Sequence, residues 1–434
     1  MKKIKNHILV FILIVIFGSS LYLINQNKEN DINSIDLKDL PYKEFNLDKE
    51  DYLEDFNYAY GVLEQYYPFF EINKKLYGID WLSNKEEYEI YILESKNDQD
   101  FYNKMNDVLA ELNNLHTQLL DDSYGLFMYL TFYNVPDANW RHDISKLYEK
   151  ENVRRRYKIN NQNIKNYIDE NIKNESLKST DIRYDNLTTD IIIKDKLAYI
   201  KIKSLLGELY RQKDEEVLGN FLEEIKNYPN LIIDIRGNGG GDSGYWQEFL
   251  LPKIIDRDYQ TITHNFIKSG ELNQKIYEQE RFNPNIEGFL KDCNFDNEVK
   301  EIIKDFDYYS SYTNIVKASK DSIRYKGNIY LLVDEGVYSS SEMLASFCKE
   351  TGLAKLVGTR TGGDGIGFDP MQVDLPNSGY ILRFSDSLGV TESGHINELD
   401  KTLPDFLVED DVIAQTKKLE DQEVIKRVIK DAGI

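Results

Sequence analysis

The stretch "NIYLLVDEGVYSSSEMLASF" (residues 328–347) decides the fold. It begins with an apolar run typical of a buried strand, crosses a short turn, and continues as a helix up to Gly352. Two related units lie on either side: "NLIIDIRGNGGG" (230–241), a short strand that ends in a glycine loop, and "AKLVGTRT" (354–361), another strand. An amphipathic helix is expected at 214–229, before the strand of the glycine loop, and another helix at 244–255 after it. Strands that alternate with helices predict parallel strands joined by helical crossovers, and hence an α/β fold.

Changes in composition and periodicity divide the rest of the chain. Helical periodicity before residue 120 includes a helix at 101–116 that we expect His116 to close. A polar stretch without glycine between Gly125 and Gly207 then precedes the strand-rich part. We therefore expect four segments: a signal anchor or signal peptide (1–26), a tether and helical N-terminal region (27–120), a variable helical insert (121–188), and a core (189–434) with its own insert (257–320).

The N-terminus has the pattern of an exported protein. Lys2, Lys3 and Lys5 precede an apolar run at residues 8–24. A run of this length can just span a bilayer, and it also fits the apolar part of a secretory signal. The lysines on the N-terminal side predict that the remainder lies outside the cytoplasm. We expect a single-pass cell-membrane protein anchored by this segment, with a secreted protein as the alternative.

Composition excludes some partners. The formal net charge of −22 argues against a nucleic-acid partner, because binding a phosphate backbone requires a basic surface. Cys293 and Cys348 are the only cysteines, and neither belongs to a zinc-type cluster. We interpret both as ordinary thiols, and we expect neither a metal nor a cofactor.

The three consecutive serines have two interpretations. Ser339 opens the helix and Glu342 follows three residues later, which is the spacing of a capping box and the better interpretation on local grounds. A serine at a helix N-terminus also lies beside unpaired amide groups that would stabilise an oxyanion. The glycine loop, with Gly239 and Gly240, could supply a second donor from a concave nest of amides.

A nucleophilic serine needs a base, and the chain has five histidines. Three of them lie in the leader or in the two inserts, which leaves His116 and His395. An imidazole base is in turn oriented by a carboxylate, for which Glu398 and Asp405 are candidates. Each of these residues could instead be an ordinary surface group.

Taken together, the motifs resemble the tail-specific (C-terminal-processing) serine peptidases, including the tricorn and retinoid-binding-protein branch. The resemblance covers roughly residues 195–410 and extends upstream through "YPFF" and "LNNLHTQL". The motifs that carry it occur in the family's order: "LAYIKI", "LIIDIRGNGGG", "IYLLVDEGVYSSSEMLASF", "LVGTRTGGDGIG", "LPNSGYILRFS" and "NELDKTLPD". The fold that this resemblance implies is a ClpP/crotonase-like core of β/α units.

The resemblance assigns a nucleophile and an oxyanion hole. The family's nucleophile lies three residues before the glutamate of its serine motif, which here selects Ser339. Its oxyanion donors match the amides of Ser340 and Gly240, with Gly239 as a neighbour. Many members also hold the substrate's C-terminal carboxylate in a PDZ domain. Because of the glycine-free stretch, we do not expect a PDZ domain here.

The base departs from the commonest family pattern. Many members use a lysine at the position of Asp364, so a Ser–Lys dyad is not expected. The tricorn-like branch uses an upstream histidine and a later glutamate, which match His116 and Glu398. That branch has a serine before its histidine where this chain has Leu115, so that part of the relay is missing or is supplied by another group such as Thr117.

The sequence therefore predicts an exported serine peptidase that acts on peptides or proteins through Ser339, His116 and Glu398. Two alternatives stay open at this point. One is a catalytically inactive relative that binds peptides or cell-surface components, and the other is a serine esterase.

Overall fold

The computed structural model describes residues 35–41, 45–169, 186–207, 211–409 and 418–434. The predicted anchor or signal at 1–26 lies outside these residues. Among the described residues, the structure contains no helix that has both the length and the apolar character needed to cross a bilayer.

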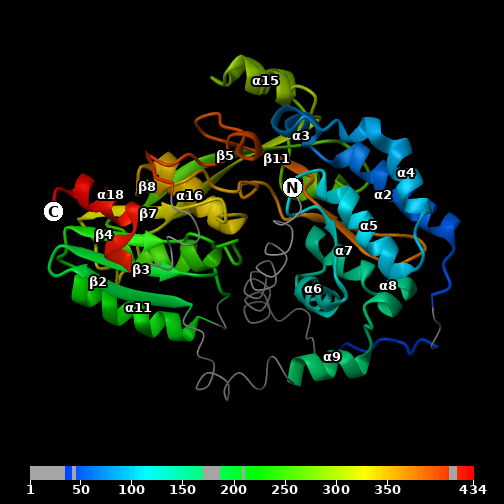
Figure 1. Cartoon of the computed structure of the whole chain (residues 1–434), viewed down its shortest axis with the longest axis horizontal. Coiled ribbons are helices and arrows are strands. Elements are labelled where there is room, and N and C mark those ends of the chain that lie inside the picture. The colour runs from blue at the N-terminus through cyan, green and yellow to red at the C-terminus, as the bar shows by residue number, and fades with distance from the viewer. Residues whose placement is uncertain (1–34, 42–44, 170–185, 208–210, 410–417) are drawn as a thin grey trace.

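A six-stranded sheet forms the core, as Figure 1 shows. Its strand order is β12-β8-β7-β4-β3-β2, and every neighbouring pair is parallel except β2 with β3. The strands are β2 (Leu187–Ile193), β3 (Leu197–Ile202), β4 (Asn230–Asp234), β7 (Asn328–Val333), β8 (Lys355–Gly358) and β12 (Phe406–Leu407). The predicted α/β class and the strand–helix alternation of the core are confirmed.

Helices cover both faces of this sheet. One face packs against α11 (Gln212–Ile225), α12 (Leu251–Ile254), α16 (Ser340–Thr351) and the π-helical turn Tyr245–Leu250. The other face packs against the C-terminal helix α18 (Glu423–Ala432). Alternate residues of the central strands enter the two cores, which is why these strands read as continuous apolar runs.

The N-terminal region is helical and forms a separate core. Its first part comprises α2 (Lys49–Tyr66), α3 (Phe70–Tyr77), α4 (Lys85–Leu93) and α5 (Asp98–Ala110). Asp48 begins α2 by accepting hydrogen bonds from two amides of the first turn, and Gly78 ends α3 in the left-handed conformation. The helices α6 (Gly125–Tyr133), α7 (Trp140–Leu147), α8 (Glu151–Arg156) and α9 (Asn161–Ile168) follow and share this core.

Two small sheets belong to the same core. One has the order β1-β10-β9, from β1 (Gln118–Leu119), β9 (Met371–Asp374) and β10 (Ile381–Phe384). The other has the order β11-β5-β6, from β5 (Tyr259–Ile267), β6 (Tyr308–Val316) and β11 (Ser387–Thr391). Between β5 and β6 lie α13 (Gln274–Gln279), α14 (Ile286–Asp292) and α15 (Asn297–Ile303), and α17 (Asn397–Asp400) follows β11.

The pairing of β1 with β10 positions the site. It joins the segment after α5 to the C-terminal hairpin, with Gln118 opposite Arg383 and Leu119 opposite Leu382. These residues are more than 250 positions apart in the chain, so periodicity within either segment does not reveal the pairing. In Figure 1 the six-stranded sheet and the helices α2–α8 lie on opposite sides of the molecule.

Candidate active site

Ser339 lies at the turn between β7 and α16, and its backbone is unusual. Its φ of 56° and ψ of −128° fall in a region that a residue with a Cβ rarely adopts. The Ser339 amide lies 3.4 Å from the oxygen of Gly363, and the Ser339 carbonyl accepts from Met343 at 3.0 Å. Such strained residues persist where their surroundings fix them, and they gather at active sites.

The predicted capping box is wrong. Ser339 occupies the N-cap position of α16, but its side chain accepts no capping hydrogen bond. Its φ of 56° lies outside the extended region that an N-cap residue normally adopts. Glu342 instead accepts hydrogen bonds from Asn397 Nδ2 at 2.7 Å and Thr402 Oγ1 at 2.6 Å. The glutamate therefore ties α16 to the α17 segment and leaves the Ser339 hydroxyl available.

The other two serines have different environments. Ser341 donates from its hydroxyl to Asn238 Oδ1 at 2.7 Å, which ties the helix to the glycine loop. The Ser340 hydroxyl is buried and has no hydrogen-bond partner among the described residues. Only Ser339 combines partial exposure with a strained turn, so the geometry selects the same serine as the sequence.

The glycine loop packs directly on Ser339. A Cβ added to Gly240 would lie 2.9 Å from Ser339 Cβ and 2.9 Å from the Ser340 nitrogen, and the φ of Gly240 is +106°. The Gly240 amide, however, donates to Asn238 Oδ1 at 3.0 Å, so this expected oxyanion donor is engaged within its own loop. Within the described part of the chain, the amides of Ser340 and Gly239 have no acceptor.

His116 does not close a helix as expected. The helix α5 ends at Ala110, and His116 lies in the turn just before β1. Its ring is positioned by the pairing of β1 with β10 and by Tyr338, whose ring centroid is 4.9 Å away.

The carboxylate that contacts His116 is Asp364 and not Glu398. His116 Nδ1 lies 2.8 Å from Asp364 Oδ2. Glu398 lies beyond Asn114, whose amide is 3.5 Å from Glu398 Oε1, and its other oxygen is 3.0 Å from Lys401 Nζ. Asp364, noted in the sequence only as the residue in place of a lysine, therefore occupies the orienting position assigned to Glu398.

Four groups converge on one oxygen of Asp364. Besides His116, the Asp364 Oδ2 atom accepts from Asn114 Nδ2 at 2.7 Å, Ser385 Oγ at 2.7 Å and the Tyr338 hydroxyl at 3.2 Å. These partners come from three separate segments and fix the carboxylate. An ionised Asp364 accepts a hydrogen bond from the protonated Nδ1 of His116, which leaves Nε2 unprotonated and able to act as a base.

The electrostatics of the pair support this state. Burial lowers the pKa of His116 below its ordinary value, and the charge of Asp364 opposes that change without reversing it. Burial also disfavours the ionised form of Asp364, but His116, together with the bonds from Asn114 and Ser385, holds its pKa well below the usual range. The imidazole is therefore neutral and the carboxylate ionised at neutral pH.

The pKa of Glu398 is shifted in the opposite direction from that of Asp364. Burial raises its pKa to about 8, and the attraction of Lys401 only partly offsets this effect. At neutral pH it is mostly protonated, which removes the charge that the orienting role would require. Lys401 also lies against Gly363, so a lysine does approach this loop, although from a different segment than in the family pattern.

Among the described residues, no hydrogen bond joins Ser339 to His116, and neither the Ser339 hydroxyl nor His116 Nε2 has a hydrogen-bond partner. Tyr338 connects them, since it precedes Ser339 and contacts the His116 ring. Catalytic hydrogen bonds are often long without substrate and shorten when it binds.

The remaining candidates lie away from this group. His395 is largely exposed and lies 3.7 Å from Asp400, and Asp405 accepts from Lys349 and from the Leu356 amide.

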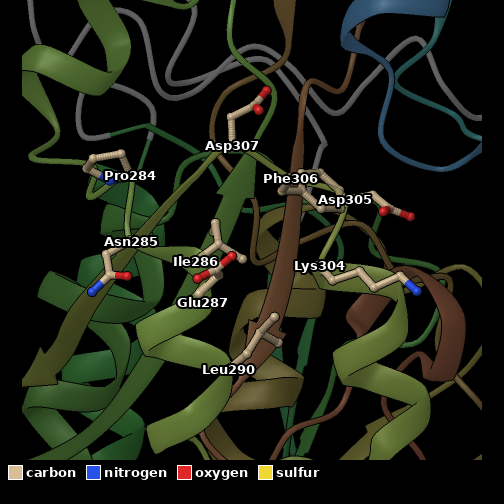
Figure 2. Close-up of a pocket in the computed structure, with 9 residues that line it drawn as sticks. All are labelled: Pro284, Asn285, Ile286, Glu287, Leu290, Lys304, Asp305, Phe306 and Asp307. Atoms are coloured by element: carbon tan, nitrogen blue, oxygen red, sulfur yellow. The ribbon is translucent and has the colours of Figure 1, made fainter.

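A surface hollow between α14 and the residues before β6, lined by Ile286, Leu290 and Phe306 among others, contains no serine, histidine or cysteine (Figure 2). Among the described residues no cluster of histidine, cysteine and acidic side chains could hold a metal ion. Both cysteines are free thiols.

Several site residues were missed by the sequence reasoning. Asn114, Tyr338 and Ser385 contact Asp364 from segments that only the fold brings together. Asn238 lies within the quoted glycine loop, where its side chain could have been considered as a support for the loop. The carboxylate in "TGGDG" was the available signal for Asp364, because it stands where the family places a catalytic group.

Comparisons with known proteins bear on the family and the fold. The model of peptidase family S41 matches residues 196–408. Mature CPAF complexed with lactacystin aligns with a TM-score of 0.56 at 14% identity, covering 89% of this chain and 99% of that chain. A protein from Parabacteroides merdae aligns with a TM-score of 0.54 at 15% identity, covering 89% and 97%. No match was found among curated protein sequences.

At these identities the solved structures show the fold, and the family match covers the strands and loops that carry Ser339, Asp364 and the glycine loop. Residues 196–408 belong to peptidase family S41, and the chain is a serine-type peptidase.

Proposed function

We propose that the chain hydrolyses peptide bonds with Ser339 as nucleophile, His116 as general base and Asp364 as the carboxylate that orients the base. The observation that carries this proposal is the strained turn at Ser339, which packs against a glycine loop and is linked through Tyr338 to a histidine bonded to a buried aspartate. This departs from the expected Ser–His–Glu arrangement in one residue.

In the proposed mechanism, His116 Nε2 accepts the Ser339 proton as the hydroxyl oxygen attacks the scissile carbonyl. The imidazolium that forms is stabilised by Asp364. His116 then protonates the leaving amine, and a water molecule releases the acyl group by the same steps in reverse. The amides of Ser340 and Gly239 would bind the oxyanion, joined by Gly240 once its bond to Asn238 is exchanged.

Hydrolysis of a mixed peptide library by purified variants tests the proposal. Ser339→Ala and His116→Ala should each reduce cleavage by at least a hundredfold. Ser340→Ala is the matched control, because it keeps the backbone amide and removes a hydroxyl that has no partner. Wild-type hydrolysis of simple esters without any peptide cleavage would instead support an esterase, and no turnover of either would support a binding protein.

We also propose that the chain is exported and held at the membrane by residues 1–26. The lysines before the apolar run at 8–24 support this proposal. Alkaline extraction of membranes tests it: the full chain should stay in the pellet, and a chain lacking residues 1–26 should not. Recovery of a shortened, fully soluble chain from the medium would show a cleaved signal instead.

A further inference from the structure

Arg383 lies near His116 and Asp364, but the proposed mechanism does not use it. It is a residue of β10, which ends at Phe384, and Ser385 follows the strand directly and donates to Asp364. Across the sheet, Arg383 is opposite Gln118, which follows His116 by two residues. The guanidinium is near enough for its charge to lower the pKa of His116.

This arginine has no counterion among the described residues. It makes no ion pair within 4.0 Å and no hydrogen bond from its side chain there. Two carboxylates act on it electrostatically, but both are bound elsewhere: Asp364 to His116, and Asp369 to Arg141 at 2.6 Å. The phenols of Tyr148 and Tyr338 are the other groups that face it.

A cation in this position is unfavourable without a ligand. The side chain is only partly exposed, and burial lowers its pKa from the ordinary arginine value while leaving it protonated. An incompletely solvated charge without a partner raises the free energy of the folded protein, and an anion that binds it removes that cost. A guanidinium presents paired N–H donors that match a carboxylate.

We propose that Arg383 binds a carboxylate of the peptide substrate on the leaving-group side of the scissile bond. This inference rests on the proposed function, because it takes its direction from the role of His116. His116 would protonate the leaving amine, so a cation close to His116 lies nearest to the part of the substrate that follows the cleaved bond. The carboxylate is either the substrate's C-terminal group or an acidic side chain close to the cleaved bond.

Matched peptides separate the two sources. Starting from one cleaved sequence, three versions differ only after the scissile bond: one with Gln and a C-terminal amide, one with Glu and an amide, and one with Gln and a free C-terminal acid. Wild type should cleave at least one acidic version with a kcat/KM about tenfold or more above that of the neutral version. Arg383→Gln should abolish the difference and leave the neutral peptide within about threefold of wild type.

Two further variants keep the test decisive. Arg383→Lys retains the charge without the paired donors and should keep part of the preference. Arg360→Gln removes an exposed arginine from the neighbouring 359–363 loop and should change nothing. Binding of the same peptides to Ser339→Ala, measured by fluorescence anisotropy, should show the same order without turnover.

The failures of the two proposals differ. Equal wild-type rates for all three peptides, or an equal loss for all three in Arg383→Gln, would overturn the role of Arg383 while the peptidase function stands. Absence of peptide cleavage together with absence of active-site labelling at Ser339 would overturn the proposed function itself.

Discussion

The backbone of Ser339 is strained where the residue packs against the glycine loop, and this strain has a measurable consequence for stability. A residue with a Cβ in such a conformation costs roughly 1–3 kcal/mol, which glycine largely avoids. Ser339→Gly should therefore be more stable than Ser339→Ala by about 1 kcal/mol or more in urea unfolding, although both are inactive. Ser346→Gly, inside α16, should be less stable than Ser346→Ala by about 1 kcal/mol. Equal free energies of unfolding for Ser339→Gly and Ser339→Ala would contradict a strained backbone at this position.

The pH dependence of activity follows from His116. The base must be neutral to accept a proton, and burial holds its pKa below the ordinary value of 6.5. We expect the midpoint of the acid limb of kcat/KM to lie below pH 6.5. Asp364→Asn removes the charge that raises the His116 pKa, so the acid limb should move to still lower pH, and the rate should fall by about 10²–10⁴.

Glu398→Gln separates the two carboxylates. Glu398 is mostly protonated at neutral pH and does not contact His116. Replacing its carboxyl group by an amide should therefore lower kcat/KM by less than tenfold and leave the acid limb of the pH profile in place. A fall in kcat/KM in Glu398→Gln as large as that in Asp364→Asn would restore Glu398 as the carboxylate that orients His116.

Among the elements, the glycine loop and α16 form one unit. A Cβ at Gly240 would meet backbone atoms of Tyr338 and Ser340, and these atoms cannot move without moving the nucleophile. Gly240→Ala should abolish peptidase activity and lower the midpoint of thermal unfolding. Gly219→Ala, in the exposed part of α11 where a Cβ meets nothing within 4 Å, should raise stability by about 0.5–1 kcal/mol with activity unchanged.

The strands and loops with a local signal were predictable. The apolar runs of β4 and β7, the glycine loop and the serine turn each depend on residues close in sequence, and all lie where they were expected. The carboxylate partner of His116 was not predictable from the sequence. It depends on the pairing of β1 with β10 and on the loop that carries Asp364, which lie far apart in the chain and meet at His116. The capping box failed because a strained turn overrode the local preference of its serine.

At the scale of the whole molecule, the active site joins two hydrophobic cores. Ser339 belongs to the six-stranded sheet and its helices, while β1 brings His116 from the N-terminal core. The helix α18 covers the opposite face of the sheet, away from α16 (Figure 1). Loss of packing there should lower stability without altering the chemistry.

Substitutions in α18 check this separation. Ile425 is fully buried against the sheet, so Ile425→Ala should lower the free energy of unfolding by about 2–5 kcal/mol. The fraction that stays folded should keep its kcat/KM. Lys426→Ala, exposed on the same helix, should change stability by less than about 0.5 kcal/mol. A large fall in kcat/KM in folded Ile425→Ala would show that the two faces are coupled.

The most direct measurement of the central claim is labelling of the folded protein with a fluorophosphonate, followed by mass spectrometry to locate the modified residue. The account predicts modification of Ser339 in wild type and in Ser340→Ala, and much slower modification in His116→Ala and Asp364→Asn. Modification of another serine, or no modification of folded wild-type protein, would contradict it.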